Sequence, residues 1–177
     1  VARTVLRESA DRVRAMALVH EKLYQSPNLA SLPIAEYVEG LCRQIEAANA
    51  VSQRSISIQC AIEPVELGMD LAIPLGLLLN ELISNCMKHA FPAGQSGKIG
   101  VSMKCCGGSQ VELCVVDDGA GFPAGFAPGK VESLGLKLSY ALSQQLDGTI
   151  DFQNTESGAQ VRVLFKLPKT AAKSKHH

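Results

Sequence analysis

The residues best suited to chemistry lie in one stretch, Leu77–Phe91, in which a few polar side chains interrupt an apolar segment. If this stretch is an α-helix, Glu81, Asn85, Lys88 and His89 share one narrow face, because spacings of four, seven and eight residues return to the same side. The other positions are almost all apolar, so we expect the helix to be buried on most sides. A carboxylate, a carboxamide and two cations in one row then indicate a site. An ordinary amphipathic helix with its charges in water fits the stretch, taken alone, equally well.

A second candidate is Asp117, at the end of a predicted strand over residues 111–117. It falls on the same face as Val111, Leu113 and Val115, which we expect to pack against helices. A carboxylate there is costly to bury unless it meets hydrogen-bond donors. A ligand with N–H groups, such as the amino edge of adenine, could supply one. The alternative is a simple Asp-Asp-Gly turn with both side chains in water.

The third candidate is the segment 118–133, which holds four glycines and two prolines and leads into a predicted helix over 134–146. A connection of this length is typical of a lid or a binding loop. Ser133, Leu134 and Gly135 would place backbone N–H groups at the helix N-terminus, where a phosphate binds readily. Together the three candidates suggest a nucleotide held between helices and a sheet.

The elements that must position these residues follow from hydrophobic periodicity. Asp70 is predicted to cap the central helix, with Pro74 in or near its first turn. Glycines 107 and 108 predict a hairpin turn, and Gly158 a second turn. The predicted helices are 3–26, 33–49, the helix around 77–91 and 134–146, and the predicted strands are 56–62, 99–103, 111–117, 149–152 and 161–167. This order predicts an α+β two-layer sandwich, with helices on one face of a mixed, mostly antiparallel sheet and water on the other.

Composition narrows the classes of function. The chain has 177 residues, 46% apolar and 19% charged, and a net charge of zero, which predicts a folded protein without a basic surface for nucleic acid or membrane. The apolar run Leu71–Leu79 is too short to span a bilayer. We expect no signal peptide, no membrane insertion and a cytoplasmic location. The six cysteines form no C-x-x-C pair, so we expect small buried side chains in a reducing compartment.

Three motifs together resemble one ATPase superfamily. They are Glu81-x-x-x-Asn85-x-x-Lys88-His89-Ala90-Phe91, Asp117-Asp118-Gly119-Ala120-Gly121, and Ser133-Leu134-Gly135-Leu136-Lys137-Leu138. In order and spacing they are similar to the N, G1 and G2 boxes of the gyrase, heat-shock chaperone, histidine kinase and mismatch-repair (GHKL) ATPases. The segment Arg14–Tyr24 resembles the second helix of the dimerisation domain in one class of bacterial sensor histidine kinases, whose G2 box is also shortened to Ser-Leu-Gly-Leu. The resemblance covers roughly residues 10–167.

The resemblance implies a division of the chain and a reaction. Residues 1–26 would be the remnant of the second dimerisation helix, 31–168 the ATP-binding catalytic domain, and 169–177 a disordered tail with a tag remnant at His176 and His177. The domain would transfer the γ-phosphoryl group of ATP to a histidine of a two-helix dimerisation hairpin. The implied partners are that dimerisation domain, a second copy in a homodimer, and a response regulator or histidine-containing phosphotransfer protein.

The resemblance also implies a role for each site residue. Asn85 would ligate Mg²⁺, which bridges the ATP phosphates, and Glu81 would be the base that polarises the attacking nucleophile. Lys88 and His89 would contact phosphate or ribose, and Asp117 would accept from the adenine amine. Gly119 and Gly121 would let the backbone approach the nucleotide, and the helix start at Ser133, Leu134 and Gly135 would face the phosphates. Lid residues 120–133 would order only around nucleotide.

Three departures from the family pattern matter. The resemblance implies that the acceptor motif precedes this segment and that His20 is not the acceptor, so we expect no autophosphorylation. Ala159 stands where many relatives carry a threonine, and the short G2 box has fewer glycines, so we expect weak ATP affinity. Two alternatives stay open: another GHKL serine kinase or ATPase, and a non-catalytic nucleotide sensor or scaffold. The dimerisation-type helix counts against the first, and the pair Glu81 and Asn85 against the second.

Overall fold

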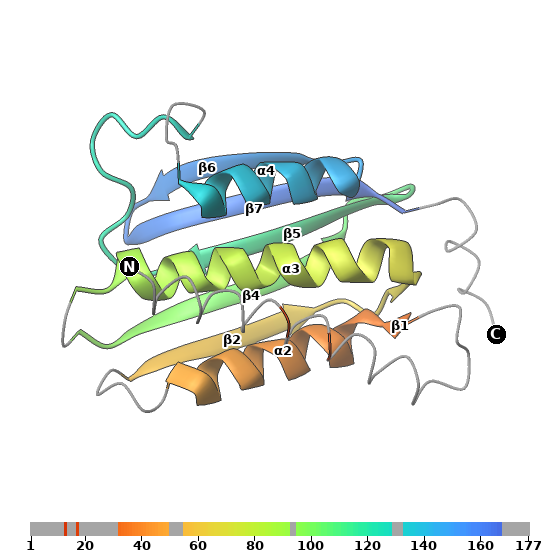
Figure 1. The fold of residues 1–177 in the computed structure, drawn as a ribbon, viewed down its shortest axis with the longest axis horizontal. Coiled ribbons are helices and arrows are strands. Elements are labelled where there is room, and N and C mark those ends of the chain that lie inside the picture. Colours follow the sequence, from red (N-terminus) through yellow and green to blue (C-terminus); the bar gives the residue numbers. More distant parts are fainter. Residues whose placement is uncertain are drawn as a thin grey trace.

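A five-stranded sheet forms one layer of the protein, with the strand order β2-β4-β5-β7-β6 (Figure 1). The computed structural model describes Val13, Ala17 and residues 32–49, 55–92, 95–128 and 133–167. β2 pairs in parallel with β4, and the remaining neighbours in this sheet are antiparallel. The strands are β2 Ile56–Ile62, β4 Gly97–Cys105, β5 Gln110–Asp117, β6 Thr149–Thr155 and β7 Gly158–Lys166.

Among the residues that the structure describes, three helices cover one face of this sheet and lie side by side across it in Figure 1. They are α2 Ile34–Asn49, α3 Met69–Asn85 and α4 Leu134–Gln145. A second, two-stranded antiparallel sheet pairs β1 Leu32–Pro33, which directly precedes α2, with β3 Glu66–Leu67, which precedes α3. The predicted two-layer α+β fold is confirmed. Of the predicted helix over 3–26, the structure describes Val13 and Ala17, both helical. The rest of that helix, His20, the domain boundary between 26 and 31 and the tail from 169 lie outside the described residues.

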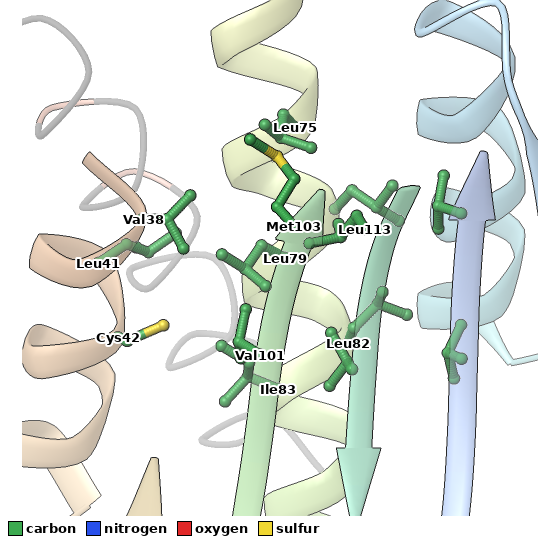
Figure 2. Packing of buried hydrophobic residues seen from close by; sticks show 14 of the residues in the cluster. Val38, Leu41, Cys42, Leu75, Leu79, Leu82, Ile83, Val101, Met103 and Leu113 are labelled. Carbon is green, nitrogen blue, oxygen red and sulfur yellow. The ribbon is translucent and has the colours of Figure 1, made fainter. Parts of the chain in front are cut away.

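The core lies between α3 and the sheet. Leu75, Leu79 and Leu82 of α3 face Val101 of β4 and Leu113 of β5 (Figure 2). Each fully buried leucine contributes roughly 1.5–3 kcal/mol, so this contact holds the central helix firmly on the sheet. Alternating residues of β4, β5 and β7 face this core and are buried: Ile99, Val101, Met103, Val111, Leu113, Val115, Val161, Val163 and Phe165.

The start of α3 differs from the prediction. Gly68 is the N-cap residue, no side chain caps the helix, and Asp70 is the second helical residue. The predicted Asp70 cap is therefore wrong, although a carboxylate in the first turn still interacts favourably with the helix dipole. Pro74 lies inside the helix, where it removes the N–H that would otherwise bond to the Asp70 carbonyl.

The opposite face of the sheet is polar, as predicted. Glu112 of β5 lies 2.9 Å from Lys104 and 3.9 Å from Arg162, which also reaches Asp151 at 3.6 Å.

The prediction for the cysteines is only partly right. Cys42, Cys86 and Cys114 are buried and Cys60 is half-buried, but Cys105 and Cys106 are exposed because β4 ends there in the Gly107-Gly108 turn. All six thiols are free.

Candidate functional site

The central helix changes geometry where the polar row lies. α3 ends at Asn85, and Cys86–Ala90 continue as a π-helical turn, η1. Glu81 is 7% exposed and Asn85 half-buried, whereas Lys88 and His89 are exposed. The uniform α-helical spacing behind the predicted narrow face therefore ends at Asn85, because a π turn bonds i to i+5 and rotates the residues that follow. Nothing in the apolar spacing of this stretch signals that change.

The N-terminus of α4 lies against the polar residues of α3. A Cβ built on Gly135 would be 3.4 Å from both the Oε2 atom of Glu81 and the Oδ1 atom of Asn85. Ser133 caps α4, since its Oγ accepts the N–H of Leu136 at 3.2 Å. The first N–H groups of a helix have no partner within the helix and favour an anion. The structure thus brings together the first and third predicted candidates.

Asp117 is buried, with 4% exposure, and its carboxylate is held from the protein side. The Oδ1 atom accepts the N–H of Gly119 at 3.0 Å and the N–H of Ala159 at 3.2 Å. These two donors offset much of the cost of burying the charge. The next acid is different: Asp118 is exposed and its Oδ1 accepts the N–H of Lys98 at 2.7 Å. Of the two adjacent acids, only Asp117 points into the interior.

Cys86 joins Asp117 to the central helix. Burial raises the pKa of the Cys86 thiol, and the charge of Asp117 and a hydrogen bond to it raise that pKa further. The thiol therefore stays protonated and donates to the carboxylate. Sequence reasoning missed this contact because Cys86 reads as one more apolar residue of the helix. Its position directly after Asn85 was the available signal.

The loop after β5 approaches its neighbours too closely for side chains. A Cβ on Gly119 would lie 2.3 Å from the carbonyl oxygen of Ala90, and one on Gly158 would lie 2.1 Å from the carbonyl oxygen of Asp117. The N–H of Ala120 donates to that same Ala90 oxygen at 2.8 Å. The π turn is thereby fixed to the loop at its end, just as Cys86 fixes it at its start.

The described part of the predicted lid, residues 118–128, is anchored to β6. Phe122 stacks on Phe126 with centroids 4.4 Å apart, and both rings meet the edge or face of Phe152. Asn154 holds the backbone of Phe122 twice, accepting its N–H at 2.7 Å and donating to its carbonyl at 3.0 Å. Gly121, with φ +71°, makes room for that amide. The sequence predicts the loop but not this anchor.

These contacts form one continuous arrangement around the end of α3. Gly135 lies next to Glu81 and Asn85. Cys86 follows Asn85 and contacts Asp117. Lys88 and His89 are exposed and belong to η1, the turn that Cys86 begins. The arrangement offers a helix N-terminus for anions, a carboxamide and carboxylate for cations, and a buried acceptor for an N–H group. In the ranges that the structure describes, no group of three or more His, Cys, Asp or Glu side chains could hold a metal.

Comparison with known protein families identifies the family of the chain. The family model described as "Histidine kinase-, DNA gyrase B-, and HSP90-like ATPase" matches residues 70–171, more than half of the chain. The chain belongs to this ATPase family. A second model, described as "Histidine kinase", matches residues 1–49. Together the two matches identify the chain as the ATP-binding catalytic region of a sensor histidine kinase.

Relatives of this histidine kinase region are consistent with that assignment. It is 32% identical over 162 residues to the sensor histidine kinase PdtaS of Mycobacterium tuberculosis, covering 90% of this chain and 32% of the relative. It is 27% identical over 161 residues to blue-light-activated histidine kinase 2 of Erythrobacter litoralis, covering 86% and 44%. The chain thus spans about a third to under a half of these relatives.

A solved structure supports the fold of the kinase region. The histidine kinase domain of an Erythrobacter litoralis blue-light-activated histidine kinase superposes with a TM-score of 0.78 at 23% identity, covering 90% of this chain and 75% of that one. None of the helices described in the kinase region is long and apolar enough to cross a membrane.

Proposed function

We propose that this kinase region binds ATP as its Mg²⁺ complex between α3, η1, α4 and the loop after β5, and transfers the γ-phosphoryl group to a histidine. The observation that carries the proposal is the fixed position of Asp117. The Asp117 carboxylate is buried and accepts two backbone N–H groups and the thiol of Cys86, the residue after Asn85. It can accept one more hydrogen bond from a donor on a ligand. The amino group of adenine is such a donor.

The phosphate side of the site is assigned to the start of α4 and to η1. Ser133, Leu134 and Gly135 direct the N-terminus of α4 toward Asn85, which suits the negative charge of phosphates. Lys88 and His89 are exposed on η1 and would contact phosphate or ribose. Gly119 and Gly121 would let the loop backbone approach the nucleotide closely.

The donor set around Asn85 fits Mg²⁺. The carboxamide oxygen of Asn85 is an oxygen ligand close to the Glu81 carboxylate, and Mg²⁺ is normally held by one or two such ligands plus phosphates and water. When bound, the ion would neutralise charge on the phosphates during an in-line transfer. Glu81 is proposed as the base that polarises the nucleophile. Its burial beside Gly135 supports a role at the phosphate side rather than beside Asp117.

The reaction of the whole protein extends beyond this chain. We propose that the acceptor histidine lies on the dimerisation hairpin, that the intact protein is a homodimer in the cytoplasm, and that it passes the phosphoryl group to a response regulator or a histidine-containing phosphotransfer protein. His20 is not assigned as the acceptor. The alternative of a serine kinase or other ATPase of the superfamily is disfavoured by the histidine kinase match over residues 1–49.

Calorimetric titration of ADP with and without Mg²⁺ tests the site. Asp117→Asn keeps the oxygen that accepts two N–H groups but replaces the other oxygen, an acceptor, with an amide NH2 donor that would face the adenine amino group. Affinity should therefore fall roughly tenfold to a hundredfold with or without metal. Asn85→Ala should remove mainly the Mg²⁺-dependent part. Asp118→Asn, which changes the exposed neighbouring acid, is the matched control and should bind like wild type. Equal binding by all four proteins would show that the nucleotide site is not here.

Phosphotransfer tests the reaction separately. The chain is mixed with a dimerisation domain that contains an acceptor histidine, and γ-labelled ATP is added. Label should appear on that histidine, and Glu81→Gln should abolish it while still binding ADP. Nucleotide binding without any transfer would favour the non-catalytic sensor or scaffold, and label on His20 would overturn the assignment of the acceptor.

A further inference from the structure

Two cysteines meet across the contact between α2 and the edge strand β2. Cys42 lies on α2 with 2% exposure, and Cys60 lies on β2, half-buried against the same apolar cluster. Figure 2 shows Cys42 beside Val38 and Leu41 on α2 near the buried cluster. The two thiols share a hydrogen bond. They are therefore near neighbours although 18 positions separate them in the sequence.

A second bond fixes the register of this contact. The N–H of Ile58 donates to the Oε1 atom of Glu46 at 3.1 Å. Cys42 is one helical turn before Glu46, a rise of about 6 Å, and Cys60 is two residues after Ile58, a rise of roughly 6.6 Å. Because these rises match, Glu46 with Ile58 and Cys42 with Cys60 are successive contacts of an antiparallel helix and strand. The thiol pair is thus held in place by the fold.

The two sulfurs are chemically unequal. The hydrogen bond between the thiols raises the pKa of Cys42 and lowers that of Cys60, and burial raises the pKa of Cys42 further. Arg43 also lowers the pKa of Cys60, against burial and the charges of Glu39 and Glu46, which raise it. Cys60 is more accessible than Cys42 and has the lower pKa, so it more readily forms the thiolate, which is the reactive form.

We propose that Cys42 and Cys60 form an oxidisable dithiol that closes a disulfide between α2 and β2 when the protein meets a hydroperoxide. The Cys60 thiolate attacks the peroxide oxygen, the O–O bond breaks, and the products are a sulfenic acid and, after protonation, water or an alcohol. The Cys42 sulfur then attacks the sulfenic sulfur, its proton leaves with the hydroxyl as water, and the S–S bond forms. Two thiols lose two electrons in total, and one peroxide gains them.

The other buried cysteines are placed differently. Cys86 donates to Asp117, and Cys114 accepts from the Nε2 atom of Gln160 at 3.2 Å. Burial raises the pKa of both thiols, so both react slowly. The new bond would fasten α2 to β2, the edge strand of the sheet. It would thereby restrict separation of α2 from that edge.

The test uses the chain with Cys105→Ser and Cys106→Ser, which removes the two exposed thiols and leaves four of the six cysteines. The folded protein is treated with a small excess of hydrogen peroxide, and thiols are counted after denaturation. We expect the count to fall from four to two, a non-reduced digest to contain the Cys42–Cys60 linked peptide, and the melting temperature to rise by about 5 °C. Dithiothreitol should reverse all three changes.

Single variants identify the roles. With Cys42→Ser, peroxide should leave Cys60 as a sulfenic acid that dimedone labels, and the rise in melting temperature should be lost. With Cys60→Ser, Cys42 should stay unlabelled and reduced. Circular dichroism of both variants confirms that they fold. Four titratable thiols after peroxide treatment, a linked peptide that pairs any other cysteines, or a link that forms only in denaturant would overturn the proposal.

Discussion

The thiol of Cys86 donates to the buried carboxylate of Asp117, and the residue before Cys86 is Asn85. Two adjacent residues therefore serve the two ends of the proposed site: Asn85 as the proposed metal ligand, and Cys86 as a hydrogen-bond partner of Asp117, the proposed acceptor for the purine. This relationship depends on the π geometry of Cys86–Ala90, which begins directly after Asn85.

Removing this thiol should weaken nucleotide binding modestly. Cys86→Ala leaves Asp117 with its two backbone donors but lets the carboxylate turn, so ADP affinity should fall about threefold to tenfold. Cys86→Ser restores a donor and should recover most of the loss. Calorimetric titration measures both variants. If the alanine and serine variants bind alike, the thiol has no positioning role.

Gly158 should not tolerate a side chain. A methyl group there would lie 2.1 Å from the carbonyl oxygen of Asp117, so Gly158→Ala should force β7 away from the loop and lower the free energy of unfolding by about 2 kcal/mol or more. Gly100→Ala is the control, because the nearest atom to its added methyl is 3.9 Å away. Urea unfolding of the two variants should separate them clearly, and similar losses would contradict the close approach.

Asn154 should control the order of the loop after β5. Asn154→Ala removes both bonds to the backbone of Phe122, and we expect the Phe122 amide to exchange its hydrogen about tenfold faster, corresponding to roughly 1.4 kcal/mol. Gln153→Ala changes the exposed neighbouring residue and should leave that amide protected. Hydrogen exchange resolved by NMR makes the comparison. Unchanged exchange in Asn154→Ala would show that the aromatic contacts alone hold the loop.

Tyr37 should make the fold sensitive to alkali. Its ring is fully buried against Gly76, its hydroxyl has no hydrogen-bond partner in the described ranges, and burial raises its pKa above the ordinary 10.0. The unfolded chain loses this proton near pH 10, so the stability that depends on the neutral hydroxyl is present below that pH and is lost as pH rises further.

Tyr37→Phe separates this effect from others. At pH 7 its unfolding free energy should equal that of wild type or exceed it by about 1 kcal/mol, because an unsatisfied hydroxyl is removed. Above pH 10 it should lose less stability than wild type. Tyr140→Phe, at a half-exposed position, is the control. Urea unfolding between pH 7 and 10.5 measures all three proteins, and a loss above 1 kcal/mol at pH 7 would reveal a hidden partner for the hydroxyl.

Periodicity was sufficient to predict the layers of the fold, because apolar residues at spacings of two and of three to four mark which side of each element is buried. It also identified Asp117 as a core-facing acid, and the structure buries it. It failed where a single residue changes backbone geometry without changing polarity. Cys86 begins a π turn, and Asn154 binds the backbone of Phe122 through two hydrogen bonds. Neither feature leaves a pattern in the spacing of apolar residues.

The parallel pairing of β2 with β4 has a consequence for the boundaries of the domain. The ATPase family model begins at residue 70, whereas β2 and α2 come earlier in the chain. Without them, the hydrogen-bonding edge of β4 and one flank of α3 would be bare, and an uncovered edge strand invites pairing with other chains. We therefore expect a chain that lacks α2 and β2 to self-associate through the uncovered edge of β4.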